Sequence, residues 1–372
     1  MVKKRRLKSG EIAWFLPRLH HNYIEWINLL SDDCNIASTI YVVTSSQQLQ
    51  RPSSARIVQL IESRFSTFLG ARYGYGGANK FRFIANLRSL WGIFKVRKFS
   101  KVVIREPSRI LSLQVLIFCL LFRVEHIVLY SQTHKIYQKR VFNRTVNALF
   151  GFLNLTYVST VMPPLDCFNY PNMRFIPFIH SGEESVCDYT NLRILTISKF
   201  QERKRLIEFL DIVREMVMAR VMVKWLVIGE INNFDQQSYY EKLKELVLEY
   251  RLESHVEIKV NLGFEEVRSS YKWCNLFLLA SCNEPAAYSV IEALSFARPT
   301  FCDVSNGTHG YIHQPRYGYT FSGLKGLNET IKLAWESGTL DEMHNNILAD
   351  NRSAVLYTRH SHMVTNLLGS ES

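Results

Sequence analysis

Short apolar runs alternate with amphipathic stretches along the second half of the chain. The apolar runs have the length of single buried strands, and they cover 192–198, 223–229, 255–260, 274–281 and 299–304. The stretches between them repeat apolar residues at helical spacing, and they cover 204–221, 238–252 and 265–273. This alternation predicts a parallel sheet covered by helices on both faces, which is a doubly wound α/β fold.

The first half shows the same two kinds of segment in a less regular order. Its predicted strands cover 11–16, 38–43, 101–105, 125–131 and 153–159. Its predicted helices cover 81–97, 108–122 and 135–149. At the other end of the chain, a further helical stretch covers 339–368. The longest apolar run, 110–122, contains Gln114 and is too short to cross a bilayer. The sequence therefore predicts a second α/β unit and no transmembrane helix.

Charge divides the chain where the pattern changes. Residues 1–180 carry 25 Lys and Arg against 8 Asp and Glu, whereas residues 181–372 carry 20 against 25. The loop 175–185, which contains Pro177 and Gly182, marks this shift. The shift predicts a first domain over 1–178 and a second over 179–340. A C-terminal helix over 341–372 can cross back to the first domain.

The cysteines and the N-terminal sequence indicate the cellular compartment. The seven cysteines form no CxxC pair and lie mostly in apolar surroundings, so we expect reduced thiols and neither a zinc site nor a disulfide framework. The basic start MVKKRRLKSG is followed by polar residues and lacks the apolar core of a signal peptide. Together these features predict a cytoplasmic protein.

Two carboxylates stand out after the predicted strand 274–281. Glu284 lies in the loop that follows it, and Glu292 lies about one turn into the next helix. Ligands of doubly wound sheets bind outside the carboxyl ends of the strands. The amides at the helix start, around Ser289 and Val290, suit a phosphate. A carboxylate one turn later suits the two hydroxyls of a ribose, and Glu284 suits the hydroxyls of a sugar.

Two other interpretations fit the same pair of carboxylates. A glutamate in the first turn of a helix stabilises the helix dipole without any ligand. Two carboxylates that flank one glycosidic bond form the acid and nucleophile of a glycosidase, and that assignment depends on their separation in space.

Several motifs agree in order and spacing over about a third of the chain. Glu284 and Glu292 form an E-x7-E element, which is followed by the dipeptide AL and by a proline that opens the next predicted strand. Lys199 and Lys204 form a basic pair in SKFQERKR, after the first strand of the second domain. In these features residues 192–321 resemble the donor-binding domain of the retaining GT-B glycosyltransferases of family 4, the glycosyl transferases group 1 set. The resemblance implies two Rossmann-like domains that face each other across a cleft, an acceptor-binding domain over 1–178 and a nucleotide-sugar-binding domain over 179–340.

The resemblance also implies roles for side chains and backbone. Glu292 would hold the nucleotide ribose, Glu284 would contact the donor sugar, and Lys199 and Lys204 would neutralise the departing diphosphate. The amides of Ser289 and Val290 would bind a phosphate oxygen, and that of Ala287 suits the hydroxyls of the sugar. The backbone of Val260, Asn261 and Leu262 would frame the base. The donor is then a nucleotide-sugar co-substrate. No metal is expected, because fixed cations and helix-end amides stabilise the leaving charge.

Some positions depart from the family pattern. Lys199 stands where the family has arginine, which keeps the charge and loses bidentate geometry. Arg205 stands where the family has a glycine, so the adjacent turn is expected to differ. The N-terminal glycine-rich loop of the family is replaced by FLPRLHHNYIEW. The family's histidine that reaches the donor sugar corresponds to His134, which has the usual residue type, or to Gln132.

The basic first half predicts an anionic partner. The stretch 81–101 interleaves Phe, Trp and Leu with Arg and Lys, which fits a core helix with a solvated basic face or a helix on an anionic membrane. The expected partners are a UDP- or GDP-sugar, a glycan or polyprenyl-linked acceptor and the inner face of the cytoplasmic membrane, in bacterial lipopolysaccharide, O-antigen or capsule assembly. The alternative is a non-catalytic basic protein on a degenerate GT-B scaffold. Nucleic acid is not expected, because the basic residues form no recognition motif.

Overall fold

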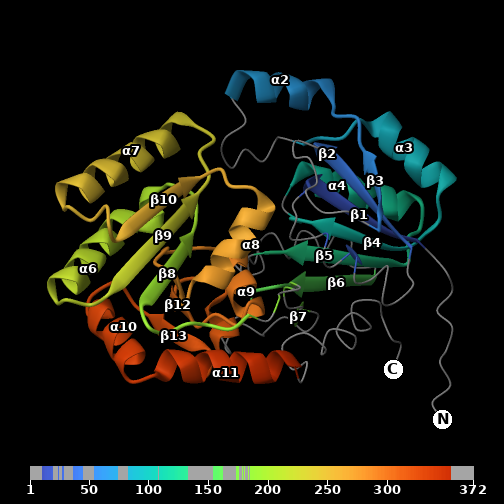
Figure 1. Cartoon of the computed structure of the whole chain (residues 1–372). Coiled ribbons are helices and arrows are strands. Elements are labelled where there is room, and N and C mark those ends of the chain that lie inside the picture. Colours follow the sequence, from blue (N-terminus) through green and yellow to red (C-terminus); the bar gives the residue numbers. More distant parts are fainter. Residues whose placement is uncertain are drawn as a thin grey trace, which may run out of the picture. The chain divides into compact units, whose positions relative to one another are not determined.

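The computed structural model forms two compact units, one within residues 1–179 and one within 180–359 (Figure 1). The residues that it describes are 11–19, 24, 27–28, 37–44, 54–73, 83–107, 109–132, 154–161, 173–175, 178, 180, 183 and 185–352. The predicted helix 135–149 lies outside these residues, as does the part of the predicted C-terminal helix beyond residue 352.

Seven parallel strands form the sheet of the first unit in the order β3-β2-β1-β4-β5-β6-β7. The strands are β1 (Glu11–Arg18), β2 (Ser38–Thr44), β3 (Arg56–Gln59), β4 (Phe99–Arg105), β5 (His126–Ser131), β6 (Asn154–Ser159) and β7 (Met173–Phe175). The described helices include α2 (Arg64–Tyr73), α3 (Leu87–Val96) and α4 (Ile110–Leu121). The five strands predicted in this half are confirmed, and the edge strands β3 and β7 were not predicted.

Side chains of the central strand β1 point alternately into two cores. Ala13 and Phe15 belong to the core under α3 and α4, where Phe15 stacks on Phe94 with ring centroids 5.7 Å apart. Trp14 and Leu16 belong to the core on the opposite face. The sheet is therefore buried on both faces, which explains why its central strands are nearly continuous apolar runs.

The helix predicted over 81–97 begins later than expected. Asn86 has an extended backbone, and its side chain accepts hydrogen bonds from two amides of the first turn, so it is the N-cap of α3. Ala85, just before it, pairs with Glu62 in an antiparallel bridge. The prediction was wrong for 83–86 because apolar spacing does not reveal a cap, and residues 81–82 lie outside the described residues.

Six parallel strands form the sheet of the second unit in the order β10-β9-β8-β11-β12-β13. The strands are β8 (Leu192–Ile197), β9 (Val223–Gly229), β10 (Val256–Val260), β11 (Leu276–Leu279), β12 (Thr300–Asp303) and β13 (Gly318–Phe321). The α-helices are α6 (Leu206–Met218), α7 (Phe234–Glu249), α8 (Phe264–Trp273), α9 (Tyr288–Ser295), α10 (Leu327–Glu336) and α11 (Thr339–Arg352), and the short 3-10 helices are η3 (Glu202–Lys204) and η4 (His309–Ile312).

Helices cover both faces of the second sheet, as predicted. Residues of α6, α7 and α10 pack into one core with β8 and β9, whereas α8 and α9 pack on the other face (Figure 1). Because all six strands are parallel, their carboxyl ends lie at one edge of the sheet. None of the helices within the described ranges is long and apolar enough to cross a bilayer.

Candidate active site

Charged side chains gather where the strands of the second sheet end. Lys199 follows β8, Glu284 follows β11, and Asp303 is the last residue of β12. The parallel arrangement brings Lys204 and Glu284 together, although they are 80 positions apart in the chain. This edge is where doubly wound sheets bind ligands.

Glu284 is held by two basic side chains. Lys204 Nζ lies 2.5 Å from Glu284 Oε2, and the guanidinium of Arg203 donates to the same oxygen. The side chains of Lys204 and Glu284 are 8% and 12% exposed, so the pair is largely shielded from water. Burial lowers the pKa of Lys204, while the Glu284 carboxylate acts in the opposite direction. An anionic ligand that reached Lys204 would therefore meet a weakly screened positive charge.

Backbone hydrogen bonds fix the loop that carries Glu284. The amide of Cys282 donates to the carbonyl oxygen of Arg203 at 3.0 Å, and the amide of Gly307 donates to the carbonyl oxygen of Glu284 at 2.9 Å. Between them, Asn283 adopts a left-handed backbone with φ of 52° and turns the chain. The loops after β8, β11 and β12 are thus tied to one another, so three strands together position Glu284.

The turn after Lys204 has the backbone conformation that glycine favours. Arg205 has φ of 53° and ψ of 36° between η3 and α6. Its guanidinium lies 3.3 Å from the carboxylate of Asp303. Arginine therefore occupies a position in which glycine would be unstrained.

Glu292 lies on α9, and its carboxylate is close to two other side chains. The Tyr271 hydroxyl donates to Glu292 Oε2 at 2.8 Å, and His180 Nε2 lies 3.8 Å from Oε1. Burial, and after it the charge of Glu292, raises the pKa of Tyr271, so this hydroxyl remains a donor. The Glu292 side chain is 22% exposed, which leaves carboxylate surface that can accept hydrogen bonds from a ligand.

The first turn of α9 was proposed to hold a phosphate. The helix begins at Tyr288, as predicted, and its N-cap residue Ala287 provides no side-chain cap. The amide of Val290 already donates to the carbonyl oxygen of Ala287 at 3.2 Å. Of the three amides suggested by the sequence, those of Ala287, Ser289 and Val290, the last therefore has an acceptor within the chain.

Lys199 does not share the Glu284 ion pair. Its ammonium group lies 3.2 Å from Glu230 Oε2, and both side chains are about half exposed. The charge of Lys199 nevertheless contributes to lowering the pKa of Lys204. The two lysines of the basic pair are therefore electrostatically coupled, and of the two it is Lys204 that is bonded to Glu284.

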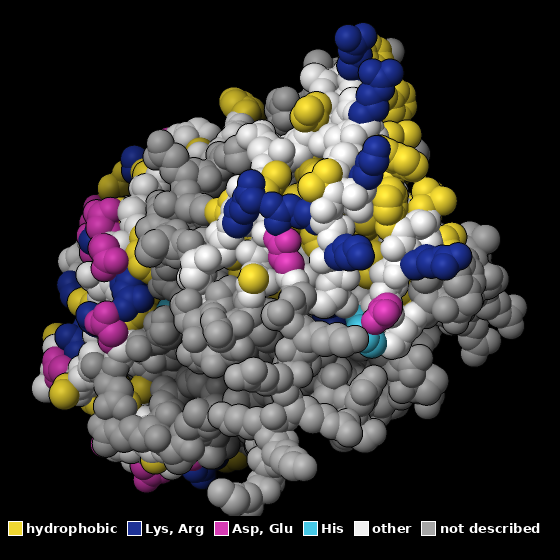
Figure 2. Space-filling model, turned by 90° about the vertical axis from the view of Figure 1, so that its right-hand side faces the viewer, with side chains coloured by type: hydrophobic (Ala, Val, Ile, Leu, Met, Phe, Trp, Pro, Cys, Tyr) yellow, Lys and Arg dark blue, Asp and Glu magenta, His cyan; other side chains and the backbone are white. Residues whose placement is uncertain are grey.

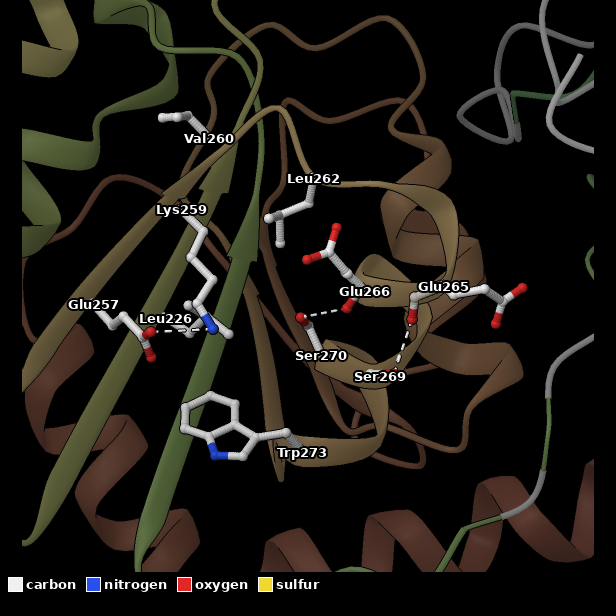
Figure 3. Close-up of a pocket in the computed structure, with 10 residues that line it drawn as sticks. All are labelled: Leu226, Glu257, Lys259, Val260, Leu262, Glu265, Glu266, Ser269, Ser270 and Trp273. Carbon is white, nitrogen blue, oxygen red and sulfur yellow. Dashed lines mark hydrogen bonds and ion pairs between the residues drawn. The ribbon is translucent and has the colours of Figure 1, made fainter. Parts of the chain in front are cut away.

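The backbone expected to frame a nucleotide base borders a pocket of about 620 Å³ (Figure 3). Val260 ends β10 and lines the pocket together with Leu262. Asn261, between them, has a left-handed backbone with φ of 53°, and its side chain accepts a hydrogen bond from the amide of Ile231. This double constraint fixes the course of the loop after β10.

The pocket lies between the strands β9 and β10 and the helix α8. Figure 3 shows Trp273 at the end away from Val260 and Leu262, and the ion pair of Glu257 and Lys259, 3.0 Å apart, along the strand side. The two carboxylates of the E-x7-E element are not among the residues that line it. The residues expected to bind a ribose and a sugar therefore do not line this pocket.

The histidine proposed to reach the donor sugar, His134, lies outside the described residues. Its alternative, Gln132, is described and accepts a hydrogen bond from Arg105 Nη2 at 3.2 Å. Three residues of the site were not predicted, namely Arg203, Tyr271 and His180. Arg203 had a signal in the basic run ERKR, whereas the other two lie in sequence that nothing marks as functional.

Among the residues that the structure describes, no three His, Cys, Asp or Glu side chains are grouped so that they could hold a metal ion. The acidic side chains of the site are instead bonded to basic or hydroxyl groups, as with Glu284 and Lys204 or Glu292 and Tyr271.

A family model matches the part of the chain that contains this site. Residues 184–346 match the model of the glycosyl transferases group 1. The matched region includes Lys199, Lys204, Glu284 and Glu292. A comparison of the chain with curated proteins gave no match.

The fold of the chain is similar to that of solved glycosyltransferases. A glycosyltransferase from Rickettsia africae matches with a TM-score of 0.67 at 11% identity, over 98% of this chain and 100% of that one. HepE of Anabaena, solved with UDP and glucose, gives 0.71 at 11% identity over 97% and 100%. WaaG, a glycosyltransferase involved in lipopolysaccharide biosynthesis, gives 0.64 at 13% identity over 96% and 100%. The predicted GT-B fold, with two Rossmann-like α/β domains, is confirmed.

Proposed function

We propose that the protein is a retaining glycosyltransferase that transfers a sugar from a UDP- or GDP-sugar to a glycan or lipid-linked acceptor. The observation that carries the proposal is the meeting of Lys204 with Glu284 at the carboxyl edge of the second sheet, inside the domain matched to the glycosyl transferases group 1. The nucleotide-sugar donor is supported by HepE, a structure of similar fold that was solved with UDP and glucose.

The proposed donor site assigns one role to each charged group. Glu292 accepts hydrogen bonds from the ribose, and the pocket beside Val260, Asn261 and Leu262 receives the base. Glu284 binds hydroxyls of the donor sugar. The diphosphate lies near Lys204 and Lys199, with the first amides of α9 as further donors. The assignment of Glu284 and Lys204 is supported by their contact at the carboxyl edge of the sheet.

Breaking the bond between sugar and diphosphate separates charge. Positive charge develops on the sugar ring, and the departing nucleoside diphosphate carries away the bonding electron pair. Lys204 and Lys199 stabilise this leaving group, and the shielding of Lys204 from water strengthens its effect. We assign this stabilisation to cations of the chain. As the new bond forms, the acceptor hydroxyl gives its proton to an oxygen of the departing diphosphate.

Ligand binding tests the donor site directly. At about 100 times its Kd, a ligand stabilises the folded chain by about 2.7 kcal/mol, which is visible as a higher melting temperature. We expect UDP or GDP to produce this shift in the wild type and not in Glu292→Ala. Equal shifts in both proteins would remove the ribose role, and absence of a shift in the wild type with either nucleotide would remove the donor proposal.

A second measurement concerns stereochemistry and catalysis. UDP- and GDP-sugars are screened for hydrolysis, and the anomeric configuration of the released or transferred sugar is followed by NMR. Retention of the donor configuration supports the proposal, whereas inversion contradicts it. A protein that binds nucleotides and cleaves no donor would favour the alternative of a non-catalytic GT-B scaffold.

The proposed acceptor is inferred from exposed side chains of the first unit. Along α4, Leu113, Ile117 and Leu121 are all exposed and lie four residues apart, so they form one ridge. On the adjacent α3, Leu87 and Trp91 are exposed, and the Trp91 ring meets that of Phe122, the residue that follows α4, with centroids 5.3 Å apart. We call these five exposed residues, Leu87, Trp91, Leu113, Ile117 and Leu121, the apolar face of α3 and α4.

Basic residues border this apolar face. Arg88, Lys95, Lys98 and Arg123 are exposed on or next to the two helices. Figure 2, which faces the side where α3 lies in Figure 1, shows hydrophobic side chains beside Lys and Arg side chains. An apolar surface with a cationic border matches an anionic membrane surface. We therefore propose that the protein acts at the inner face of the cytoplasmic membrane on a polyprenyl-linked or lipid-linked acceptor, in lipopolysaccharide, O-antigen or capsule assembly.

Vesicle flotation tests this location. We expect the protein to float with vesicles of phosphatidylglycerol and phosphatidylcholine, less so as salt is raised, and to remain unbound with phosphatidylcholine alone. Absence of binding to the anionic vesicles at low salt would remove the membrane proposal and leave the donor site unaffected.

A further inference from the structure

The ring of Tyr271 is fixed in the core between α8 and α9. It is 1% exposed and stacks on Phe296 with centroids 5.4 Å apart and planes 8° apart. Phe277 of β11 packs against it at 5.8 Å. The backbone carbonyl of Tyr271 also accepts a hydrogen bond from the buried guanidinium of Arg298 at 2.7 Å. The position of the Tyr271 hydroxyl is therefore set by the core of the second unit.

This hydroxyl has one proton and two possible acceptors. Glu292 Oε2 lies 2.8 Å away, and the carbonyl oxygen of Ser289 lies 3.3 Å away. A charged acceptor at the shorter distance forms the stronger bond, so the proton belongs to Glu292. The hydroxyl consequently ties one carboxylate oxygen to a rigid part of the fold.

The other side of Glu292 is bounded as well. Ser295 donates to the carbonyl oxygen of Glu292 at 2.6 Å, and His180 Nδ1 lies 2.8 Å from Ser295 Oγ. A glutamate side chain has several rotatable bonds, and its rotamers would otherwise spread the carboxylate over a range of positions. Here both its backbone and its carboxylate are held by neighbours.

We propose that Tyr271 is a positioning residue that holds the Glu292 carboxylate in the orientation needed to bind the two hydroxyls of a ribose. This inference rests on the proposed function and adds to it a residue on α8 that touches no ligand. Tyr271 acts through Glu292, because a binding group must be held to within about 0.5 Å of its productive position.

The experiment uses Tyr271→Phe, which keeps the stacked ring and removes the hydroxyl. Calorimetry measures the Kd of UDP and GDP and of their 2′,3′-dideoxy analogues, which lack the hydroxyls that Glu292 would bind. We expect Tyr271→Phe to weaken the ribonucleotide about tenfold and to leave the dideoxy analogue unchanged. In a Glu292→Gln background, the same substitution should cause a much smaller further loss, because the charged acceptor is gone.

Tyr317→Phe is the matched control. Tyr317 is also a buried tyrosine of the second unit, and its hydroxyl donates to the carboxylate of Asp350 on α11. We expect this control to change neither Kd by more than about twofold. The two melting temperatures show whether each variant is folded.

Two results would overturn the inference while the donor proposal stands. Tyr271→Phe could bind UDP or GDP as tightly as the wild type, or it could weaken the ribonucleotide and the dideoxy analogue equally, which would indicate a general structural role. Failure of the wild type to bind either ribonucleotide would instead remove the proposed function itself.

Discussion

The two units place their charged side chains in different ways. In the second unit, Lys204 and Glu284 are shielded from water and bonded to each other, and Glu292 is bonded to Tyr271. In the first unit, Arg88 and Lys95 are exposed on the outer side of α3, next to exposed apolar residues. Buried charges must be paired, so their exact geometry determines what they do. Exposed charges act through the sum of their electrostatic potentials, so the loss of any single one has a small effect. The second unit is therefore suited to chemistry at a fixed point and the first to contact with an extended surface.

The largest expected effect is on the reaction that we assign to the buried charges of the second unit. Lys204→Met removes the cation that we assign to the leaving diphosphate, and we expect kcat for donor cleavage to fall about 100-fold to 1000-fold. Lys242→Met, an exposed lysine of α7, is the control and should leave kcat unchanged. The rate is measured as release of UDP or GDP from the donor.

Loss of stability must be separated from loss of chemistry in this variant. Lys204→Met leaves the largely buried Glu284 paired with Arg203, and breaking a buried pair is destabilising. The double variant Lys204→Met/Glu284→Gln removes both charges and should regain much of the melting temperature. We expect it to remain inactive. A double variant with near wild-type activity would show that the pair is structural.

The next effect tests the extended surface of the first unit. Ile117→Glu places a carboxylate in the middle of the apolar face of α3 and α4, and we expect binding to anionic vesicles to fall roughly tenfold. Leu248→Glu on α7 is the matched control, because Leu248 is an exposed leucine on a helix of the second unit. Nucleotide binding should be unchanged in both variants.

Another occupant of the same face would give a different result. If the wild type were a dimer in solution, bound no anionic vesicles, and became monomeric with Ile117→Glu, the face would be an interface between two copies of the chain. Sedimentation velocity of the two proteins distinguishes this outcome from the membrane proposal.

The same contrast explains which parts of the fold could be predicted from the sequence. The central strands are buried on both faces and were recognised as apolar runs. Three edge strands, β3, β7 and β13, were missed. Each is only three or four residues long, and β3 has the partly polar sequence RIVQ. An edge strand has one neighbour and more contact with water, so its sequence carries a weaker apolar signal.

The candidate site was predictable where a motif marked it. Glu284, Glu292 and Lys204 belong to a pattern of residue types and spacings, and the structure brings Glu284 and Lys204 into contact. Tyr271 and His180 act on Glu292 across distances of 21 and 112 positions in sequence. Such contacts depend on how helices pack on the sheet, and no local pattern encodes them.

A smaller effect is expected on the pH dependence of kcat, because Lys204 is buried whereas the charges of the first unit are exposed. Burial lowers the pKa of Lys204 below its usual 10.5, so its charge is lost earlier than that of an exposed lysine as pH rises. We expect the alkaline fall in kcat to begin below pH 10.5, and Lys204→Arg, if active, to move it upward because arginine stays charged. Coincident alkaline limbs in the two proteins would contradict this assignment.

Stability should change in the opposite direction over the same range. Between the lowered pKa and 10.5, the unfolded chain binds more protons at this position than the folded chain. The contribution of Lys204 to the free energy of unfolding therefore rises with pH while activity falls. Chemical denaturation of the wild type and of Lys204→Met at several alkaline pH values measures the difference.

The smallest expected effect concerns two arginines with left-handed backbones. Arg220 follows α6 with φ of 60°, and Arg205 precedes it with φ of 53°. Glycine is unstrained there, so Arg220→Gly should raise the free energy of unfolding by about 0.5 kcal/mol. Arg205→Gly should gain less, because it also loses the contact of its guanidinium with Asp303 at 3.3 Å. Urea denaturation measures both values. A larger gain at Arg205 than at Arg220 would show that the contact with Asp303 does not stabilise the protein. The charged side chains at the carboxyl edge of the second sheet would then be less closely paired than we infer from the comparison of the two units.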